Sequence, residues 1–123
     1  MQPIPAAVTA CLSETLRLDT KTNAAARGTQ LYEGLLGLRE KYDVIGDVRG
    51  GHGLMTAVEF VSDRAKKTPL DAGTVKKIQQ GIYEAGAMVR PAPPHIMMSP
   101  PLIITEAEVQ IMIDAFDTAI GAI

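Results

Sequence analysis

The feature that most constrains the fold of this chain is a change in hydrophobic periodicity near Tyr42. Before Tyr42, apolar residues recur every three or four positions, as on one face of a helix. They are Ile4, Val8, Cys11, Leu12 and Leu16, and then Leu31, Leu35 and Leu38. After Tyr42, short runs rich in β-branched residues alternate with turn residues, which is typical of strands. We therefore expect leading helices over residues 1–42 and an α/β core over residues 43–123.

Two helices are predicted in the leading part. The first runs from Pro5 to Leu18, and the segment 19–22 interrupts it. Asn23 can cap the second helix, which continues to about Tyr42. Three glycines weaken this second helix by roughly 1 kcal/mol each relative to alanine. Either packing stabilises it, or close backbone contacts require the glycines, which are Gly28, Gly34 and Gly37.

The core is predicted to begin with a β-hairpin. Residues 44–49 and 54–61 read as strands, and the glycine-rich segment 50–53 between them reads as a turn that needs positive φ. Two further extended pieces, 88–90 and 95–98, surround a proline-rich loop.

Helix signals separate and follow these strands. Thr68 and Pro69 can open a helix that Gly86 ends. Thr105 and Glu108 form a capping box at the start of the last helix. The apolar stripes of the two helices are Val75, Ile78 and Ile82, and then Val109, Met112, Ile113, Phe116 and Ile120. The fold class is therefore α+β, with a small, mostly antiparallel sheet covered by helices, on one face.

Composition excludes several classes of function. The net charge of −2 gives no basic face for nucleic acid. The sequence has neither an apolar run of about 18 residues nor a signal peptide, so we expect no membrane partner and a cytoplasmic location. The single cysteine, Cys11, allows no internal disulfide, and its apolar neighbours predict a buried, inert thiol.

Common catalytic and metal-binding motifs are absent from the sequence. His52 and His95 are far apart, without Cys or carboxylate at ligand spacing, so we expect no metal site. His52 reads as an exposed turn residue and His95 as a residue that joins a loop to a strand. The glycines of segment 50–53 precede a strand rather than a helix, so they do not form a phosphate loop. No nucleophile has a partnered base, and we assign no catalytic residue.

Arg90 is the one candidate binding residue. It follows the apolar pair Met88 and Val89 and precedes a proline-rich loop. Its guanidinium could bind a carboxylate through two parallel hydrogen bonds. The alternative is a structural ion pair with a nearby Asp or Glu, which spacing alone favours. Asp47, Glu59 and Glu108 read as strand or cap residues.

Several motifs resemble one family closely. They are the segment 44–61 (VIGDVRGGHGLMTAVEFV), then Gly86-Ala-Met-Val-Arg-Pro, and then Ser99-Pro-Pro-Leu-Ile-Ile-Thr-Glu. This order resembles the carboxy-terminal small domain of the class III (omega-amino acid:pyruvate type) aminotransferases, which are pyridoxal-phosphate enzymes of fold type I. The resemblance covers nearly the whole chain and is most specific over residues 42–106.

The resemblance implies roles for particular residues. It implies that Arg90 binds the substrate carboxylate and that Arg49 serves the fold. In the ornithine-type branch the carboxylate arginine lies later, at the position of Met97, so the chain is similar to the branch that uses Arg90.

The resemblance also implies that pyridoxal phosphate is bound elsewhere in the parent enzyme. Its catalytic lysine and acidic partner belong to a large domain. The six lysines of this chain fall on polar helix faces or turns: Lys21, Lys41, Lys66, Lys67, Lys76 and Lys77. We therefore expect this chain alone to bind no cofactor.

Three hypotheses for function follow. The chain is a carboxy-terminal fragment or a truncated gene product of such a transaminase, inactive alone. Alternatively it is a non-catalytic interaction module that forms a homo-oligomer or docks on a separate large-domain chain, because the stripe of its first helix would otherwise be exposed. The third hypothesis is a cofactor-free enzyme, for which no acid/base pair converges in the sequence.

Overall fold

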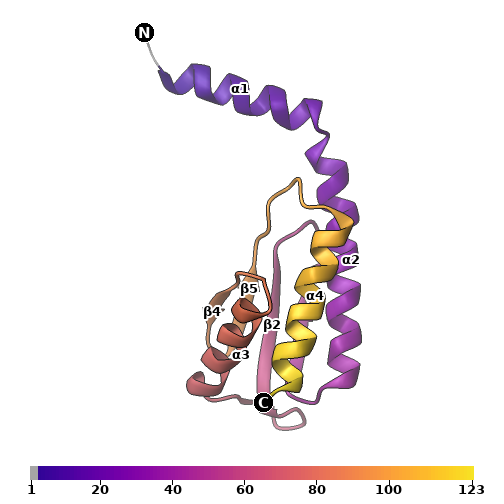
Figure 1. Cartoon of the computed structure of the whole chain (residues 1–123), viewed down its shortest axis with the longest axis vertical. Helices are drawn as coiled ribbons and strands as arrows, with labels where there is room; N and C mark the ends of the chain where they lie inside the picture. Colours follow the sequence, from indigo (N-terminus) through magenta and orange to yellow (C-terminus); the bar gives the residue numbers. More distant parts are fainter. Residues whose placement is uncertain (1–2) are drawn as a thin grey trace.

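A computed structural model describes residues 3–123 of the protein. Two helices open it, α1 (Pro3–Arg17) and α2 (Thr20–Lys41), and the chain bends between them at Asp19. Asp19 has φ 48° and ψ 52°, the left-handed conformation that ends a helical path. As a result α1 projects away from the rest of the molecule, whereas α2 runs alongside the sheet and α4 (Figure 1).

A five-stranded sheet forms the centre of the remaining structure. Its strands are β1 (Ile45–Arg49), β2 (Thr56–Asp63), β3 (Thr68–Pro69), β4 (Arg90–Ala92) and β5 (His95–Met98). The order is β1-β2-β5-β4, with β3 paired to β2, and every pairing is antiparallel. The predicted hairpin of β1 and β2 is confirmed. Its turn contains Gly51 and Gly53 at φ 88° and 87°, so the expectation of positive φ is also confirmed.

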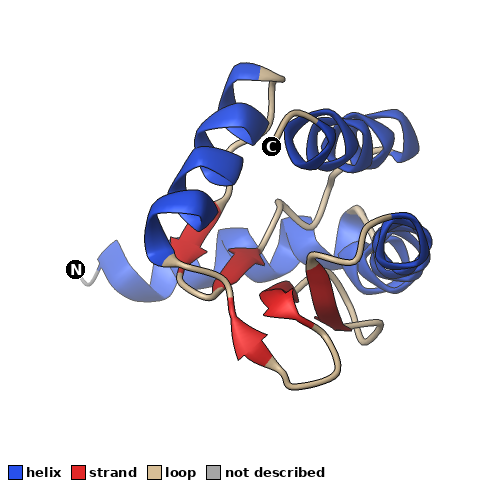
Figure 2. Cartoon of the chain, turned by 90° about the horizontal axis from the view of Figure 1, so that it is seen from below, coloured by secondary structure: helices blue, strands red, loops and turns tan. Residues whose placement is uncertain are grey.

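Helices α2, α3 (Ala72–Glu84) and α4 (Glu106–Gly121) lie on one face of the row of strands (Figure 2). The sheet contributes alternate residues to the core, including Val58, Phe60 and Ile96, each with an exposed fraction of 0%. The three predicted apolar stripes of α2, α3 and α4 are buried against them. The α+β fold with a small antiparallel sheet covered by helices is therefore confirmed.

Two predicted helix starts were wrong. Helix α2 begins at Thr20 rather than after Asn23, because the interruption is confined to the bend at Asp19. Helix α3 begins at Ala72, because Asp71 is its cap and accepts a hydrogen bond from the Thr74 amide at 2.9 Å. Thr68 and Pro69 instead form β3 and pair with β2. The predicted capping box of Thr105 and Glu108 on α4 is confirmed.

Two other expectations need correction. The extended piece predicted over 88–90 is a strand that begins at Arg90 and ends at Ala92. Cys11 is exposed rather than buried, because α1 projects from the body and its apolar stripe is not covered.

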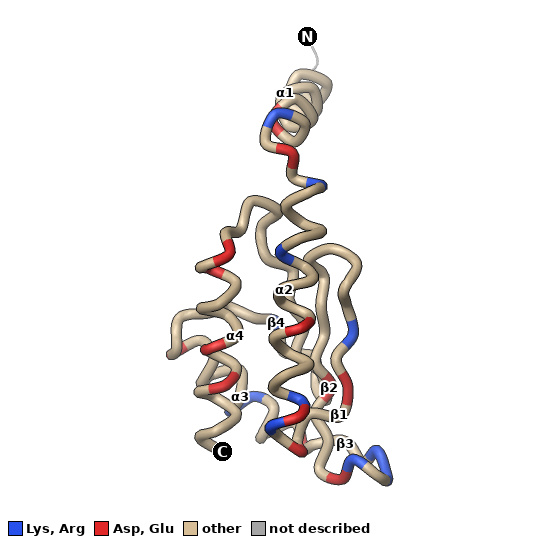
Figure 3. Tube along the Cα trace, turned by 90° about the vertical axis from the view of Figure 1, so that its right-hand side faces the viewer, with Lys and Arg blue, Asp and Glu red and all other residues tan. Residues whose placement is uncertain are grey.

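Charged residues of both signs are interspersed over the body of the molecule, and the outer part of α1 carries none (Figure 3). The pair Lys66 and Lys67 lies in the exposed turn between β2 and β3. Over residues 3–123, every helix is too short or too polar to cross a lipid bilayer.

Candidate functional site

Arg90 is the first residue of β4, a strand at the edge of the sheet. It pairs with Met97 of β5, and residues that pair directly across an antiparallel ladder point to the same face. Arg90 is exposed. In the part of the chain that the structure describes, no carboxylate lies within ion-pair distance of its guanidinium. The structural ion pair that spacing favoured is therefore not formed.

Arg90 lines a cavity of about 730 Å³. The wall is built from the chain before β4, the end of β5, the loop that follows it, and the first turns of α4. The wall is mostly apolar, and the polar side chains that line it are Arg90, Ser99 and Glu108. A cavity of this size and character, with few polar groups, is typical of a small-molecule site.

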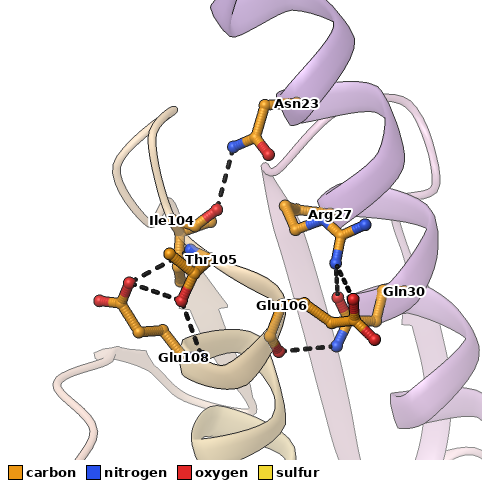
Figure 4. A network of polar contacts seen from close by, with 7 residues as sticks. All are labelled: Asn23, Arg27, Gln30, Ile104, Thr105, Glu106 and Glu108. Carbon is orange, nitrogen blue, oxygen red and sulfur yellow. Dashed lines mark hydrogen bonds and ion pairs between the residues drawn. The ribbon is translucent and has the colours of Figure 1, made fainter.

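The loop 99–105, which forms one wall of this cavity, is fixed by α2. The Asn23 side-chain amide donates hydrogen bonds to the carbonyls of Leu102 and Ile104, at 2.8 and 2.9 Å. Figure 4 shows Asn23 reaching from α2 to this loop. Asn23, which the sequence suggested as a helix cap, therefore positions the cavity wall instead.

A second group of contacts joins α2 to the start of α4. Arg27 donates to the Gln30 side chain at 2.7 Å and lies 3.6 Å from the Glu106 carboxylate. Gln30 in turn donates to the Glu106 backbone carbonyl at 3.0 Å (Figure 4). These contacts fix the amino terminus of α4, whose first turns line the cavity.

In the capping box beside these contacts, Glu108 is already engaged. Its Oε1 accepts hydrogen bonds from the Thr105 hydroxyl at 2.7 Å and from the Thr105 backbone amide at 3.2 Å. The carboxylate is thus held at the helix cap. Glu108 contributes to the cavity wall, and the predicted cap role engages its Oε1.

The sheet brings together four charged or titratable residues that are distant in sequence. Asp47 pairs with Glu59, and Glu59 pairs with His95, in one row across β1, β2 and β5. Arg49 donates to Glu59 at 2.9 Å and to Asp47 at 3.3 Å. His95 Nε2 lies 3.3 Å from the Glu59 carboxylate, but it is not aligned for a hydrogen bond.

Nothing in the sequence indicated this pair of Glu59 and His95. The two residues are brought together by the register of β2 against β5, and no local motif encodes that register. The Arg49 contacts explain its predicted structural role, because its charge is compensated within β1 and β2. Arg49 is therefore not free to bind an anion as Arg90 is.

The structure also locates the lysines and the histidines of the chain. All six lysines are exposed, and none lines the cavity of Arg90. The described residues therefore do not enclose a lysine as a site for an aldehyde cofactor would require. His52 is exposed in the β1–β2 turn, and over residues 3–123 no three His, Cys, Asp or Glu side chains cluster as metal ligands.

Comparison with known proteins gives consistent matches. The family model described as Aminotransferase class-III matches residues 3–120. An alanine–glyoxylate aminotransferase 2 homolog from Arabidopsis thaliana is 40% identical over 98 residues, which are 77% of this chain and 20% of that protein. A taurine–pyruvate aminotransferase from Bilophila wadsworthia is 33% identical over 122 residues, which are 94% of this chain and 26% of that protein.

A solved structure agrees with these matches. An amine transaminase from an uncultivated Pseudomonas species, in its PLP-bound (internal aldimine) form, superposes with a TM-score of 0.90 at 41% identity. The superposition covers 95% of this chain and 27% of that one. The chain thus spans about a quarter of the length of the proteins that it matches.

Proposed function

Because this chain belongs to the class III aminotransferase family, we propose that it is the carboxy-terminal small domain of a pyridoxal-phosphate-dependent transaminase. In this proposal residues 1–123 form one domain, with leading helices over 1–42 and an α/β core over 43–123. Its part in the reaction is to bind the carboxylate of the substrate through Arg90. The chemistry of the cofactor belongs to the rest of the enzyme.

The observation that supports this role is the contrast between two arginines in one row of the sheet. Arg49 pairs with Ala57, which pairs with Met97, which pairs with Arg90. Arg49 is bound to Glu59 and Asp47, whereas Arg90 is exposed at the cavity without a described carboxylate partner. An uncompensated guanidinium beside an apolar cavity is suited to a ligand that carries one carboxylate.

The residues of this chain do not suit the cofactor itself. Pyridoxal phosphate requires a lysine that forms an imine, and the lysines here are exposed on α2, on α3 and in the β2–β3 turn. This chain supplied with pyridoxal phosphate is expected to give neither an imine absorbance band nor transamination.

The test of the Arg90 role requires the complementary part of the enzyme. The chain is combined with a class III aminotransferase from which the matching region has been deleted, and transamination is measured with pyruvate as amino acceptor. Arg90→Ala should lower kcat/KM for amino acids by about tenfold to a hundredfold, the loss expected for a charge-assisted bond to a carboxylate. Simple amines, which lack the carboxylate, should be nearly unaffected.

Lys76→Ala is the matched control, because it removes one exposed positive charge from α3, away from the cavity. It should leave kcat/KM unchanged for both amino acids and simple amines. Equal losses for amino acids and amines with Arg90→Ala would contradict the proposed role. Rescue by Arg90→Lys should be partial, because an ammonium cannot make the paired contact of a guanidinium.

A second candidate function is that of an interaction module, and α1 favours it. Its apolar stripe is exposed: Ile4 by 72%, Val8 by 51%, Leu12 by 58% and Leu16 by 81%. An apolar surface of this kind is suited to bind the rest of the enzyme or a second copy of the chain.

Cys11 is exposed on the same helix, and a free, exposed thiol is suited to the reducing conditions of the cytoplasm.

A further inference from the structure

The cavity beside Arg90 is lined by methionine to an unusual degree. Four of the six methionines of the chain contribute to its wall: Met88, Met97, Met98 and Met112. They come from three separate parts of the sequence, before β4, in β5 and in α4. Because methionine is unbranched and polarizable, a surface rich in it adapts to apolar ligands of different shapes.

Part of this methionine cavity is open to a ligand. Met88 is 84% exposed, Met97 37% and Ile111, also on the wall, 51%. Met98 and Met112 also line it and are buried in the core, with exposed fractions of 3% and 9%. The cavity therefore combines buried apolar side chains from the core with exposed, flexible apolar side chains.

The charges at the cavity select the chemistry of the ligand. Arg90 is the one positively charged side chain among the described residues of the wall. The one acidic side chain among these described residues, Glu108, accepts two hydrogen bonds from Thr105 through its Oε1. A ligand with one anionic group and an apolar remainder would satisfy both parts, whereas a second carboxylate would have no described partner.

We propose that the methionine cavity binds the apolar chain of an amphiphilic monocarboxylate whose carboxylate is held by Arg90. This inference rests on the proposed role of Arg90 and adds that the length of the apolar chain sets the affinity. It also makes Met88 and Met97 specificity-determining residues. The adaptable wall predicts graded affinity along a series of carboxylates rather than selection of one length.

The experiment uses the chain itself with methionine methyl groups labelled for NMR. Acetate, butyrate and hexanoate are titrated, and their dissociation constants are compared. We expect shifts of the Met88, Met97 and Met112 methyl signals and a dissociation constant that falls roughly two- to fourfold per added methylene group, the factor expected when that group is buried. The methyl signal of Met55, exposed in the β1–β2 loop outside the cavity, serves as the internal reference.

Variants separate the two parts of the proposal. Arg90→Gln should raise the dissociation constant of hexanoate by about tenfold and leave that of 1-hexanol unchanged. Met88→Gln should make the dissociation constant depend less on the length of the apolar chain. It should preserve the tighter binding of hexanoate compared with 1-hexanol. Met88 is exposed, so the fold should tolerate this change. Met55→Gln should alter neither property.

The outcomes distinguish this inference from the function on which it rests. Affinity that depends on Arg90 but not on chain length would overturn the inference and leave the arginine role standing. Equal affinity for hexanoate and 1-hexanol, unaffected by Arg90→Gln, would overturn the arginine role and the inference together. Methyl shifts confined to Met55 would place the ligand elsewhere and likewise overturn the inference.

Discussion

At the scale of single residues, two glycines of α2 have opposite surroundings. A Cβ atom on Gly28 would lie 1.9 Å from the carbonyl oxygen of Gly53, whereas a Cβ on Gly37 would meet nothing within 4 Å. Gly28 therefore permits the β1–β2 loop to approach the helix backbone. Of the two explanations that the sequence left open, close backbone contact holds for Gly28, whereas Gly34 packs against the side chain of Ile113.

The substitution Gly28→Ala should lower the free energy of unfolding by about 1–3 kcal/mol, because the loop must move away from the helix. Gly37→Ala, the matched control, should raise it by about 0.5–1 kcal/mol through helix propensity alone. Urea denaturation of the two variants and the unmodified chain measures both changes. A stabilising Gly28→Ala would contradict the close contact.

The residues that the sequence predicted correctly are those whose partners are close in sequence. The capping box of Thr105 and Glu108 spans three residues, so its pattern could be recognised directly. Asn23 shows the limit of that reasoning, because it has cap chemistry but binds a loop distant in sequence. Thr68 also has cap chemistry, but Asp71 caps α3 instead. Asn23 binds the loop near Ile104, and Thr68 pairs with Asp63 of β2.

At the scale of secondary-structure elements, the end of α2 is joined to α4 through Asp117. Lys41 Nζ donates to Asp117 Oδ1 at 2.8 Å, and the Tyr42 hydroxyl donates to the same oxygen at 2.6 Å. The hydrogen bond from Lys41, and then that from Tyr42, hold the pKa of Asp117 below its ordinary value of 3.8. A carboxyl whose pKa is lower in the folded state stabilises the fold while it is ionised.

The hydrogen bonds that Asp117 accepts from Lys41 and Tyr42 predict how the stability of the fold depends on pH. The contribution of Asp117 is complete above the pKa of its unfolded state, near 3.8, and is lost as pH falls through the lower folded value. Asp117→Asn should therefore be less stable than the unmodified chain at pH 7, and the difference should shrink as pH falls from about 5 toward 3. Denaturation at stepped pH measures it. Asp114→Asn, an equal charge change on the exposed side of α4, is the control, and a difference independent of pH would contradict the assignment.

The elements themselves were more predictable than their contacts. Periodicity located α2, α3 and α4 and their buried stripes, because a helix that packs on one side repeats its apolar residues. Periodicity could not give the register of β2 against β5, which places Glu59 beside His95. The cavity of Arg90 depends on that same assembly, so the sequence indicated the arginine but not the methionines around it.

At the scale of the whole molecule, α1 is the part least supported by the rest of the chain. It precedes α2 in the chain and projects from the body with its apolar stripe exposed (Figure 1). Periodicity predicted the helix and its stripe correctly. It also led to a buried Cys11, because an apolar stripe shows that a surface suits burial and does not show which molecule covers it.

The exposed stripe predicts association of the chain with itself when no other partner is present. Light scattering over a range of concentrations should show a mass that rises above that of the 13.1 kDa monomer. Leu12→Glu combined with Leu16→Glu should return the chain to a monomer, because two charges would be buried in the contact. The thermal midpoint of the body should change little, since neither leucine is part of the core.

Ala6→Glu combined with Ala10→Glu is the matched control for this prediction. It adds the same two charges to exposed positions of α1, on the side of the helix away from the leucines. This variant should still associate, since the stripe is intact. If it dissociates as completely as the leucine variant, net charge rather than the apolar stripe drives association. A monomeric unmodified chain at every concentration would contradict self-association through the stripe. In that case, under the proposed function, an added large-domain chain should bind through Leu12 and Leu16.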